Sequence, residues 1–426
     1  MIDKYSAPQA LGASVPRRFH VMAKPAGSTC NLDCTYCFYL SKETLPNGPG
    51  TGEMSDETLE NFIKQYIEGV SGETVVFSWQ GGEPMLRGLE FFRTVVALQK
   101  KHAKRGQVIE NDLQTNGTLL DEEWAAFLKE NRFLVGLSID GPRELHDRFR
   151  VNKGGRPTFD KVYAAAQLLR KFGVKFNTLT CVNRVNASRP LDVYRFLRRE
   201  LGSTYIQFIP IVQVKDFETT APHTWDPSRL PMLGSPEARP DHPNSVVTDW
   251  SVDPEEYGYF LCRIFDEWLR KDLGKVLVNH FETLIARRLG HPSQICIYGE
   301  ICGKGVAIEH DGSVYSCDHY VYPEYRLGML GEKPLTEMVF SPTQVKFGYA
   351  KSESLPEYCR ACAFLRDCWG ECPKNRVIRT PAGEPGLNYL CAGLQRFFKH
   401  ASPAVERIAA EIRQHQNGPA APTSWT

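Results

Sequence analysis

Apolar and polar positions alternate with two different periods over the first half of the chain. Short runs rich in β-branched and aromatic residues have the length of β-strands, and they cover residues 19–24, 74–79, 108–114, 133–139, 174–182 and 205–211. Between them, apolar residues recur with the period of an α-helix, over residues 56–70, 89–104, 121–130, 159–172 and 191–201. Consecutive strands joined by helices pair in parallel. The pattern therefore predicts an α/β fold, and its six units, fewer than the eight of a closed barrel, indicate a partial (β/α)6 TIM-like barrel.

The pattern changes twice in the second half of the chain. Residues 213–253 are rich in Pro, Asp, Ser and Thr, and they predict a long loop or lid over one end of the sheet. Residues 254–273 predict a helix with Leu261, Phe265 and Trp268 on one face. Beyond about residue 290, Cys and Gly replace the long periodic segments, as in small domains that metals hold together.

These changes divide the chain into four parts. A chain of 426 residues is longer than one hydrophobic core usually supports, so more than one domain is expected. We predict an N-terminal extension over residues 1–18, a partial barrel over residues 19–235, a linker with a helical segment over residues 236–290, and a Cys-rich domain that ends in a C-terminal helix over residues 291–426.

The composition excludes several classes of function. Lys and Arg number 51 and Asp and Glu 50, so the net charge of +1 offers no basic surface to a long polyanion, and no nucleic-acid partner is expected. The apolar runs are too short to cross a bilayer, and the charged residues before Phe19 argue against a secretory signal. We expect a cytoplasmic protein with no membrane partner. In a reducing compartment, 13 cysteines indicate metal binding or redox chemistry rather than disulfides.

Three cysteines, Cys30, Cys34 and Cys37, form a C-x3-C-x2-C group directly after the first predicted strand. Three thiolates this close can bind an iron–sulfur cube and leave its fourth iron open for a small molecule. A zinc site would need a fourth ligand, which neither His20 nor His102 is placed to supply locally. The group therefore favours a [4Fe–4S] cluster with one open iron.

Eight further cysteines occupy the Cys-rich region, with the spacings Cys296-x5-Cys302-x14-Cys317 and Cys359-x2-Cys362-x5-Cys368-x3-Cys372-x18-Cys391. Eight thiolates make two sets of four, which suits two fully ligated clusters, but spacing alone does not show which cysteines belong together. A structural zinc site is the alternative, because C-x2-C pairs are common in zinc knuckles. The two remaining cysteines, Cys181 in a predicted strand and Cys262 in a predicted helix, are expected to be small buried apolar side chains.

The first cysteine group, with an aromatic residue before its last cysteine, resembles the motif of the radical SAM superfamily. The resemblance implies that the open iron binds S-adenosylmethionine (SAM), which is cleaved to a 5′-deoxyadenosyl radical. The segments 80–84 and 138–142, the latter with Arg150, are similar to SAM-binding segments of the superfamily. The resemblance thus implies SAM contacts from Tyr36, Gly81, Gly82, Glu83, Ser138, Arg150 and the main chain at Ile211.

The Cys-rich half resembles the SPASM extension of radical SAM enzymes that act on polypeptides. Over nearly the whole chain, the similarity is to the anaerobic sulfatase-maturating enzymes. This resemblance implies three [4Fe–4S] clusters, the first of them bound by the C-x3-C-x2-C group. It assigns one auxiliary cluster to Cys296, Cys302, Cys317 and Cys372, and the other to Cys359, Cys362, Cys368 and Cys391.

The same resemblance implies a radical SAM oxidoreductase that converts a Cys or Ser side chain of a sulfatase to Cα-formylglycine under anaerobic conditions. Its partners would be an unfolded or nascent sulfatase polypeptide and a reductant such as flavodoxin or ferredoxin. Asp318, directly after Cys317, matches the position of the family's general base, and Gln80 and Tyr39 are expected to face the substrate. Burial beside a cluster is expected to raise the proton affinity of Asp318.

Three alternatives remain open from the sequence. Another SPASM enzyme, one that cross-links or otherwise modifies a ribosomally made peptide, would share every cluster ligand. A zinc-scaffolded interaction protein without catalysis belongs to a different class, which iron analysis would exclude. An electron carrier would explain neither the barrel nor the Gly-Gly-Glu-Pro loop. Residues 213–253 are poorly matched by the resemblance and could help to set the choice of substrate.

Overall fold

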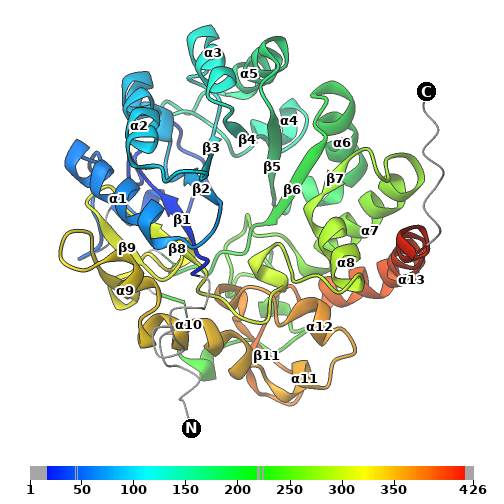
Figure 1. The fold of residues 1–426 in the computed structure, drawn as a ribbon. Coiled ribbons are helices and arrows are strands. Elements are labelled where there is room, and N and C mark those ends of the chain that lie inside the picture. The colour runs from blue at the N-terminus through cyan, green and yellow to red at the C-terminus, as the bar shows by residue number, and fades with distance from the viewer. Residues whose placement is uncertain (1–16, 44, 46, 218–220, 223–224, 418–426) are drawn as a thin grey trace.

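The computed structural model describes residues 17–417, apart from residues 44, 46, 218–220 and 223–224. Most of the predicted N-terminal extension, residues 1–16, lies outside the described residues. In the described part, the strands form one ten-stranded sheet in the order β10-β9-β8-β1-β2-β3-β4-β5-β6-β7 and one two-stranded sheet, β11-β12. Figure 1 shows the strands of the large sheet at the centre of the molecule, with helices around them.

Six strands of the large sheet are the six that the sequence predicts. They are β1 His20–Ala23, β2 Thr74–Trp79, β3 Val108–Thr115, β4 Leu134–Ser138, β5 Phe176–Val182 and β6 Tyr205–Pro210. Each pairs in parallel with the next in chain order. The predicted α/β fold with a partial (β/α)6 barrel is confirmed, and no strand end differs from its predicted position by more than two residues.

The helices between these strands also follow the predicted pattern. They are α1 Asp56–Gly69, α2 Gly88–His102, α3 Glu122–Glu130, α5 Phe159–Phe172 and α6 Pro190–Arg195, which continues into the π-helical turn Phe196–Glu200. A short helix that was not predicted, α4 Arg143–His146, follows β4. Side-chain caps fix two helix starts: Ser55 accepts a hydrogen bond from Thr58 N, and Asp121 accepts one from Trp124 N. Figure 1 shows α1, α2, α3 and α5 on the outer side of the curved sheet.

Strands from the second half of the chain extend the sheet at both edges. β8 Gly305–Ile308 pairs in parallel with β1, and β9 Ser313–Tyr315 and β10 Arg326–Met329 continue the sheet in antiparallel pairs. At the other edge, β7 Leu277–Val278 pairs with β6. These strands pair backbone groups that would otherwise be exposed at the edges of the barrel. The predicted boundary at residue 291 therefore lies within one continuous sheet, and the division into four parts stays a prediction.

The predicted helix over residues 254–273 is α7 Pro254–Lys271, and it buries the three apolar residues of its predicted face. It packs on α13 Cys391–Asn417, the predicted C-terminal helix, which also contacts α8 Asn279–Arg288. The two long helices come very close at a pair of glycines, Gly258 and Gly393. A Cβ atom on Gly393 would lie 1.9 Å from the Pro254 carbonyl oxygen, so this approach requires glycine. It fixes the start of α13, and with it Cys391, beside the barrel.

Residues 213–253 are irregular, as predicted, with the 3-10 turns Pro227–Arg229 and Pro236–Ala238 among the described residues. The segment lies against the Cys-rich region, since Met232 forms a β-bridge with Arg379. That region contains the hairpin β11 Ile378–Arg379 and β12 Pro385–Leu387 and the helices α9 Leu335–Val339, α10 Pro342–Glu353, α11 Glu357–Arg360 and α12 Leu365–Cys368. The missing periodicity of the Cys-rich sequence thus corresponds to short elements joined by loops.

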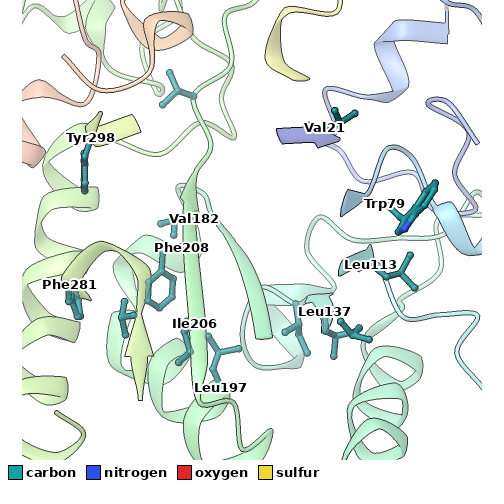
Figure 2. Close-up of a cluster of buried hydrophobic side chains, with 14 of the residues drawn as sticks. Val21, Trp79, Leu113, Leu137, Val182, Leu197, Ile206, Phe208, Phe281 and Tyr298 are labelled. Carbon is teal, nitrogen blue, oxygen red and sulfur yellow. The ribbon is translucent and has the colours of Figure 1, made fainter. Parts of the chain in front are cut away.

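Buried apolar side chains fill the space between the sheet and its outer helices. Figure 2 shows fully buried side chains from successive strands, among them Val21, Trp79, Leu113 and Leu137. Trp79 packs edge-on against Phe92 of α2, with ring centroids 5.8 Å apart. This dense core holds the carboxyl ends of the parallel strands in fixed positions. The helices that the structure describes include none long and apolar enough to cross a membrane.

Candidate active site

The predicted site residues gather at the end of the sheet where the parallel strands terminate. Residues 30–37 follow β1, residues 80–83 follow β2, Ser138 ends β4 and Ile211 follows β6. Asp318 follows the antiparallel strand β9, and its contact with Lys24, directly after β1, brings it to the same place. In parallel barrels the loops at the carboxyl ends of the strands converge, and they carry the chemistry. The fold therefore brings together residues that are almost 300 positions apart in the sequence.

The three thiols of the first cysteine group lie partly buried in the loop after β1. Cys30 Sγ accepts hydrogen bonds from Leu32 N at 3.4 Å and from Asn116 Nδ2 at 3.7 Å. Burial raises the pKa of Cys30 to about 12, and it also raises the pKa of Cys34 and of Cys37. Because crowded, buried thiols are hard to ionise on their own, this set suits a cationic metal group that would hold them as thiolates.

The described residues contain no preformed site for a single metal ion. Among the described residues, no set of three or more His, Cys, Asp or Glu side chains is close enough together to hold a single metal ion. A zinc ion would draw four thiolates to about 2.3 Å from itself, whereas an iron–sulfur cube separates its ligands by its own width.

The turn formed by Gly81 and Gly82 packs directly against the loop that carries the first cysteines. Gly81 has a φ of +113°, a conformation that favours glycine, and a Cβ atom there would lie 2.6 Å from the Gly27 carbonyl oxygen. A Cβ atom on Gly82 would lie 2.1 Å from the Thr29 carbonyl oxygen. Only glycines allow the predicted SAM-binding loop to come this close to the chain just before Cys30.

The carboxylate of Glu83 faces the protein and fastens this loop to the end of β3. It accepts hydrogen bonds from Met85 N at 3.0 Å, Thr115 Oγ1 at 2.8 Å and Asn116 N at 2.8 Å. Burial raises the pKa of Glu83 to about 7, although these hydrogen bonds oppose the shift. The side chain thus supports the loop that the resemblance associates with SAM.

Arg150 and Tyr36 meet at Asp140, a residue that was not predicted as part of the site. Arg150 Nε donates to Asp140 Oδ2 at 3.0 Å, and the Tyr36 hydroxyl donates to the same oxygen. Arg150 is only 7% exposed, so it is not a surface arginine. Asp140 directly follows the fully buried Ile139 at the end of a strand, and that position was the available signal for a functional carboxylate.

Cys181 differs from its predicted role. It is only partly buried, its N–H donates to Asp140 Oδ1 at 3.0 Å, and its sulfur lies 3.7 Å from Arg150 Nη2. The prediction of a small apolar side chain is therefore wrong for Cys181, because the strand end turns it toward polar neighbours. Cys262 is buried in α7 among apolar residues, as predicted.

Three further predicted residues lie at strand ends on the same side. Ser138 Oγ accepts a hydrogen bond from Gln114 Nε2 at 2.9 Å. Ile211 uses both of its main-chain groups within the protein, donating to Val182 O at 2.8 Å and accepting from Val252 N at 2.9 Å. Gln80 donates its N–H to the main chain of β1 at Ala23, and its side chain is partly exposed.

Asp318 is buried and paired with a lysine that the sequence analysis missed. Lys24 Nζ lies 2.9 Å from Asp318 Oδ1 and 2.7 Å from Glu309 Oε1, and the Tyr39 hydroxyl donates to Asp318 Oδ2 at 2.7 Å. Burial acts to raise the pKa of Asp318, but the charge of Lys24 and the hydrogen bonds from Tyr39 and Lys24 help to lower it overall. The expected rise in proton affinity is therefore wrong. The signal in the sequence was the position of Lys24, a charged residue at the end of a predicted apolar strand.

Four cysteines of the Cys-rich region line one apolar pocket: Cys359, Cys362, Cys368 and Cys391, together with side chains such as Phe364, Leu394 and Phe398. Two donors point at one of the sulfurs, since Cys362 Sγ accepts hydrogen bonds from Phe364 N at 3.4 Å and from Gln395 Nε2 at 3.9 Å. The start of α13 thus completes a set whose other members lie on and around α11 and α12.

The other four cysteines of this region also lie near one another. Burial raises the pKa of Cys317, and the neighbouring thiols of Cys296 and Cys372 raise it further. The pKa of Cys372 is likewise raised by burial and by the thiols of Cys302 and Cys296. These neighbours agree with the two sets of four that the resemblance implies.

Comparison with known proteins relates each half of the chain to a family. The family model described as the radical SAM superfamily matches residues 25–197, and the one described as an iron–sulfur cluster-binding domain (SPASM) matches residues 296–363. The first match contains the cysteine group after β1, and the second contains five of the eight later cysteines: Cys296, Cys302, Cys317, Cys359 and Cys362.

Individual relatives match nearly the whole chain. A serine-type anaerobic sulfatase-maturating enzyme of Bacteroides thetaiotaomicron is 45% identical over 404 residues, covering 95% of this chain and 94% of that protein. A cysteine-type anaerobic sulfatase-maturating enzyme of Clostridium perfringens is 36% identical over 396 residues, covering 92% and 99%. A solved structure of native anSMEcpe with bound AdoMet and Cp18Cys peptide superposes with a TM-score of 0.76 at 34% identity, covering 92% of this chain and 99% of that one.

Proposed function

Because this chain belongs to the anaerobic sulfatase-maturating enzymes, which combine a radical SAM domain with a SPASM iron–sulfur domain, we propose that it oxidises a Cys or Ser side chain of a sulfatase polypeptide to Cα-formylglycine. The observation that carries this proposal is the similarity to two such enzymes over at least 92% of the chain. The site supports it, since the first cysteines, the Gly81–Glu83 loop and Asp318 share one end of the sheet.

The enzymes of this family use three [4Fe–4S] clusters and SAM. When bound, these groups supply a 5′-deoxyadenosyl radical for hydrogen abstraction and a route for the electrons that leave the substrate. We assign the SAM-binding cluster to Cys30, Cys34 and Cys37. We assign the auxiliary clusters to the two sets of four cysteines, the first made of Cys296, Cys302, Cys317 and Cys372 and the second of Cys359, Cys362, Cys368 and Cys391.

For SAM itself we propose contacts from Tyr36, Gly81, Gly82, Glu83, Ser138, Arg150 and Ile211. Two features of the loops support this set. The close packing of the two glycines leaves the main chain beside the cysteine loop free of side chains. The guanidinium of Arg150 is held by Asp140 through Nε, so its remaining N–H groups are oriented and can pair with a carboxylate.

Asp318 is the group that we propose as the acceptor of the substrate proton. Its lowered pKa keeps it ionised at neutral pH, which is the form that a base requires. Lys24 and Tyr39 each hold one of its two oxygens, so the carboxylate has a fixed orientation. Each oxygen still has a lone pair available for a substrate hydroxyl or thiol. Gln80 and Tyr39 remain proposed substrate contacts.

A peptide assay tests this function and separates it from the alternative. The anaerobically reconstituted protein, given SAM and a reductant, should oxidise a short peptide with the sequence Cys-x-Pro-x-Arg or Ser-x-Pro-x-Arg at its first residue, as a mass change and an aldehyde probe would show. If both peptides stay unchanged while SAM is cleaved, and a ribosomally made peptide is cross-linked instead, the alternative holds. For the reductant we propose a flavodoxin or ferredoxin, and for the location the cytoplasm.

A further inference from the structure

A short segment joins the two auxiliary cysteine sets, because Cys368 belongs to the second set and Cys372 to the first. This linking segment, residues 369–371, has three positive φ angles in a row: +47° at Trp369, +66° at Gly370 and +50° at Glu371. A positive φ is unfavourable for a residue with a Cβ atom, and it persists only where the surrounding structure holds it. The contacts of the linking segment are therefore of interest.

The guanidinium of Arg376 holds this segment by its carbonyl groups. Its Nε donates to Gly370 O at 3.2 Å, and its Nη2 donates to Trp369 O at 2.9 Å. Its Nη1 donates to Lys351 O at 2.7 Å and to Ser354 Oγ at 3.2 Å, at the end of α10. Arg376 is only 5% exposed, and Gly370 lines the pocket of the second cysteine set. A buried positive charge thus lies directly against the segment between the two sets.

Lys351 brings a second buried cation to the first set. It is only 1% exposed, and its Nζ donates to Cys296 O at 2.7 Å and to Ile297 O at 2.8 Å. Its own carbonyl oxygen accepts the hydrogen bond from Arg376 Nη1. One cation therefore contacts the main chain of a cysteine of the first set, and the other contacts the linking segment.

The hydrogen bonds described for these two cations all go to uncharged oxygens, namely five carbonyl groups and one hydroxyl. The carboxylate of Glu371 is held by amides instead, since it accepts from Asn375 Nδ2 at 2.9 Å and from Asn388 Nδ2 at 2.7 Å. Holding the carbonyl groups does not itself require a charge, because Asn388 Nδ2 also donates to Gly370 O at 3.2 Å. Burying a cation is unfavourable unless an opposite charge compensates it. The two cations therefore suit anionic groups on the neighbouring cysteines.

The charge of Arg376 acts on thiols of both sets. Burial raises the pKa of Cys302, in the first set, to about 11, and the charges of Lys351 and Arg376 oppose this rise. Burial also raises the pKa of Cys359, in the second set, to about 11, and the charge of Arg376 opposes this rise too. A cation that favours a thiolate also favours the reduced form of a cluster, since reduction adds negative charge.

We propose that Arg376 is a positioning residue for the electron route: it holds the linking segment between the two auxiliary clusters, and its charge raises the reduction potential of both. The inference rests on the proposed function, in which these clusters take up the one electron that the substrate releases, so no further redox partner is needed. Four thiolates outweigh the positive charge of an iron–sulfide core, so each cluster is anionic and becomes more so on reduction. Lys351, which contacts the main chain of Cys296, should act mainly on the first auxiliary cluster.

Reduction potentials test this inference without any peptide. The anaerobically reconstituted holoprotein is titrated with a reductant and followed by EPR, and the signal that changes when SAM is added identifies the SAM-binding cluster. Arg376→Gln keeps an N–H donor but removes the charge. It should disfavour the reduced form of both auxiliary clusters by roughly 10-fold, which is about 59 mV for one electron. The SAM-binding cluster should change by less than about three-fold and serves as an internal reference.

Two further variants separate the charge of Arg376 from its hydrogen bonds. Arg376→Lys keeps the charge without the planar fork, so it should retain most of the wild-type potentials. Arg379→Met is the matched control, because it removes a nearby arginine whose Nε donates to Leu230 O at 2.8 Å instead of to the linking segment. All three potentials should stay close to wild type in Arg379→Met. Iron content shows whether each variant keeps its clusters.

Unchanged auxiliary potentials in Arg376→Gln with full iron content, or an equal shift in Arg379→Met, would overturn the inference. If Arg376→Gln loses its clusters, Lys351→Met decides, and an unchanged potential of the first auxiliary cluster in that variant overturns the inference as well. Either result leaves the peptide assay of the proposed function as it stands. Conversely, shifted potentials in a protein that oxidises neither peptide would support the role of Arg376 and remove only the proposed sulfatase target.

Discussion

Two buried carboxylates of the site, Glu83 and Asp318, are held in opposite ways. After β2, Glu83 accepts hydrogen bonds from two backbone N–H groups and one hydroxyl, and burial raises its pKa to about 7. After β9, Asp318 is paired with the Lys24 ammonium and accepts a hydrogen bond from Tyr39, and its pKa is lowered. Burial alone therefore does not decide the charge of a carboxylate; its partners do.

The difference separates a carboxylate that supports a loop from a carboxylate that can accept a proton. Neutral donors around Glu83 fix the shape of the loop beside the first cysteines without requiring a permanent charge. The cation beside Asp318 instead keeps that carboxylate ionised, which a proton acceptor needs and a loop anchor does not. The four predictions below test this division, from the largest expected effect to the smallest.

Removing Lys24 should have the largest effect, because it orphans two buried charges at once. Lys24→Met leaves Glu309 and Asp318 without their cation, and breaking a buried ion pair in this way costs about 3–5 kcal/mol of unfolding free energy. Chemical denaturation of the anaerobic holoprotein measures it. The double variant Lys24→Met/Glu309→Gln removes one of the orphaned charges and should recover part of the stability. An unchanged denaturation midpoint in Lys24→Met would show that these ion pairs do not stabilise the fold.

The Lys24 pair also shows what the sequence could not reveal. Lys24 and Glu309 are 285 positions apart, and their contact exists because β8 pairs with β1 at the edge of the barrel. Helical and strand periods are local properties, so α5 Phe159–Phe172 and β2 Thr74–Trp79 were predicted at their observed ends. The partner of a buried charge depends on which strands become neighbours, and no local pattern carries that information.

The cysteines show the same limit of local sequence patterns. The C-x3-C-x2-C group was predictable because its members share one loop. Cys372 lies between Cys368 and Cys391 in the sequence, yet the thiols that raise its pKa are those of Cys302 and Cys296. Its grouping became visible only by resemblance to a family and through the fold, because the hairpins and short helices of this region bring distant segments together.

Asp318→Asn should have the next largest effect, and it should affect chemistry rather than folding. The amide cannot accept the substrate proton as a carboxylate does, so kcat for peptide oxidation should fall by about 100-fold or more. Iron content and SAM cleavage without peptide should stay close to wild type. Asp311→Asn, an exposed aspartate in the β8–β9 turn, is the matched control and should keep its activity. Full turnover by Asp318→Asn would refute the assignment of the base.

Glu83→Gln should reverse this pattern, with a larger effect on stability and SAM binding than on the peptide step. In the variant, an NH2 group replaces one of the two oxygens that accept hydrogen bonds from Thr115 and Asn116 in the wild-type protein. A buried donor is then left without an acceptor, which costs about 1–3 kcal/mol of unfolding free energy. Denaturation and SAM titration measure the two effects. Once SAM is saturating, the rate of peptide oxidation should approach wild type. A selective loss of peptide oxidation with normal SAM affinity would contradict the supporting role of Glu83.

Tyr39→Phe should have the smallest effect, and it can be compared with a matched tyrosine whose hydroxyl donates to a different buried carboxylate. Loss of the 2.7 Å hydrogen bond to Asp318 removes one of the two groups that orient the carboxylate, while Lys24 keeps it charged. Peptide oxidation should therefore fall by roughly ten-fold, with SAM affinity unchanged. Tyr36→Phe removes the same atom three residues earlier, where the hydroxyl donates to Asp140 beside Arg150. That variant should weaken SAM binding instead, because the orientation of Arg150 and not of Asp318 is disturbed. If both variants changed the same kinetic parameter, the Asp140 and Asp318 groups would act as one unit, and separate roles in SAM binding and in chemistry would not hold.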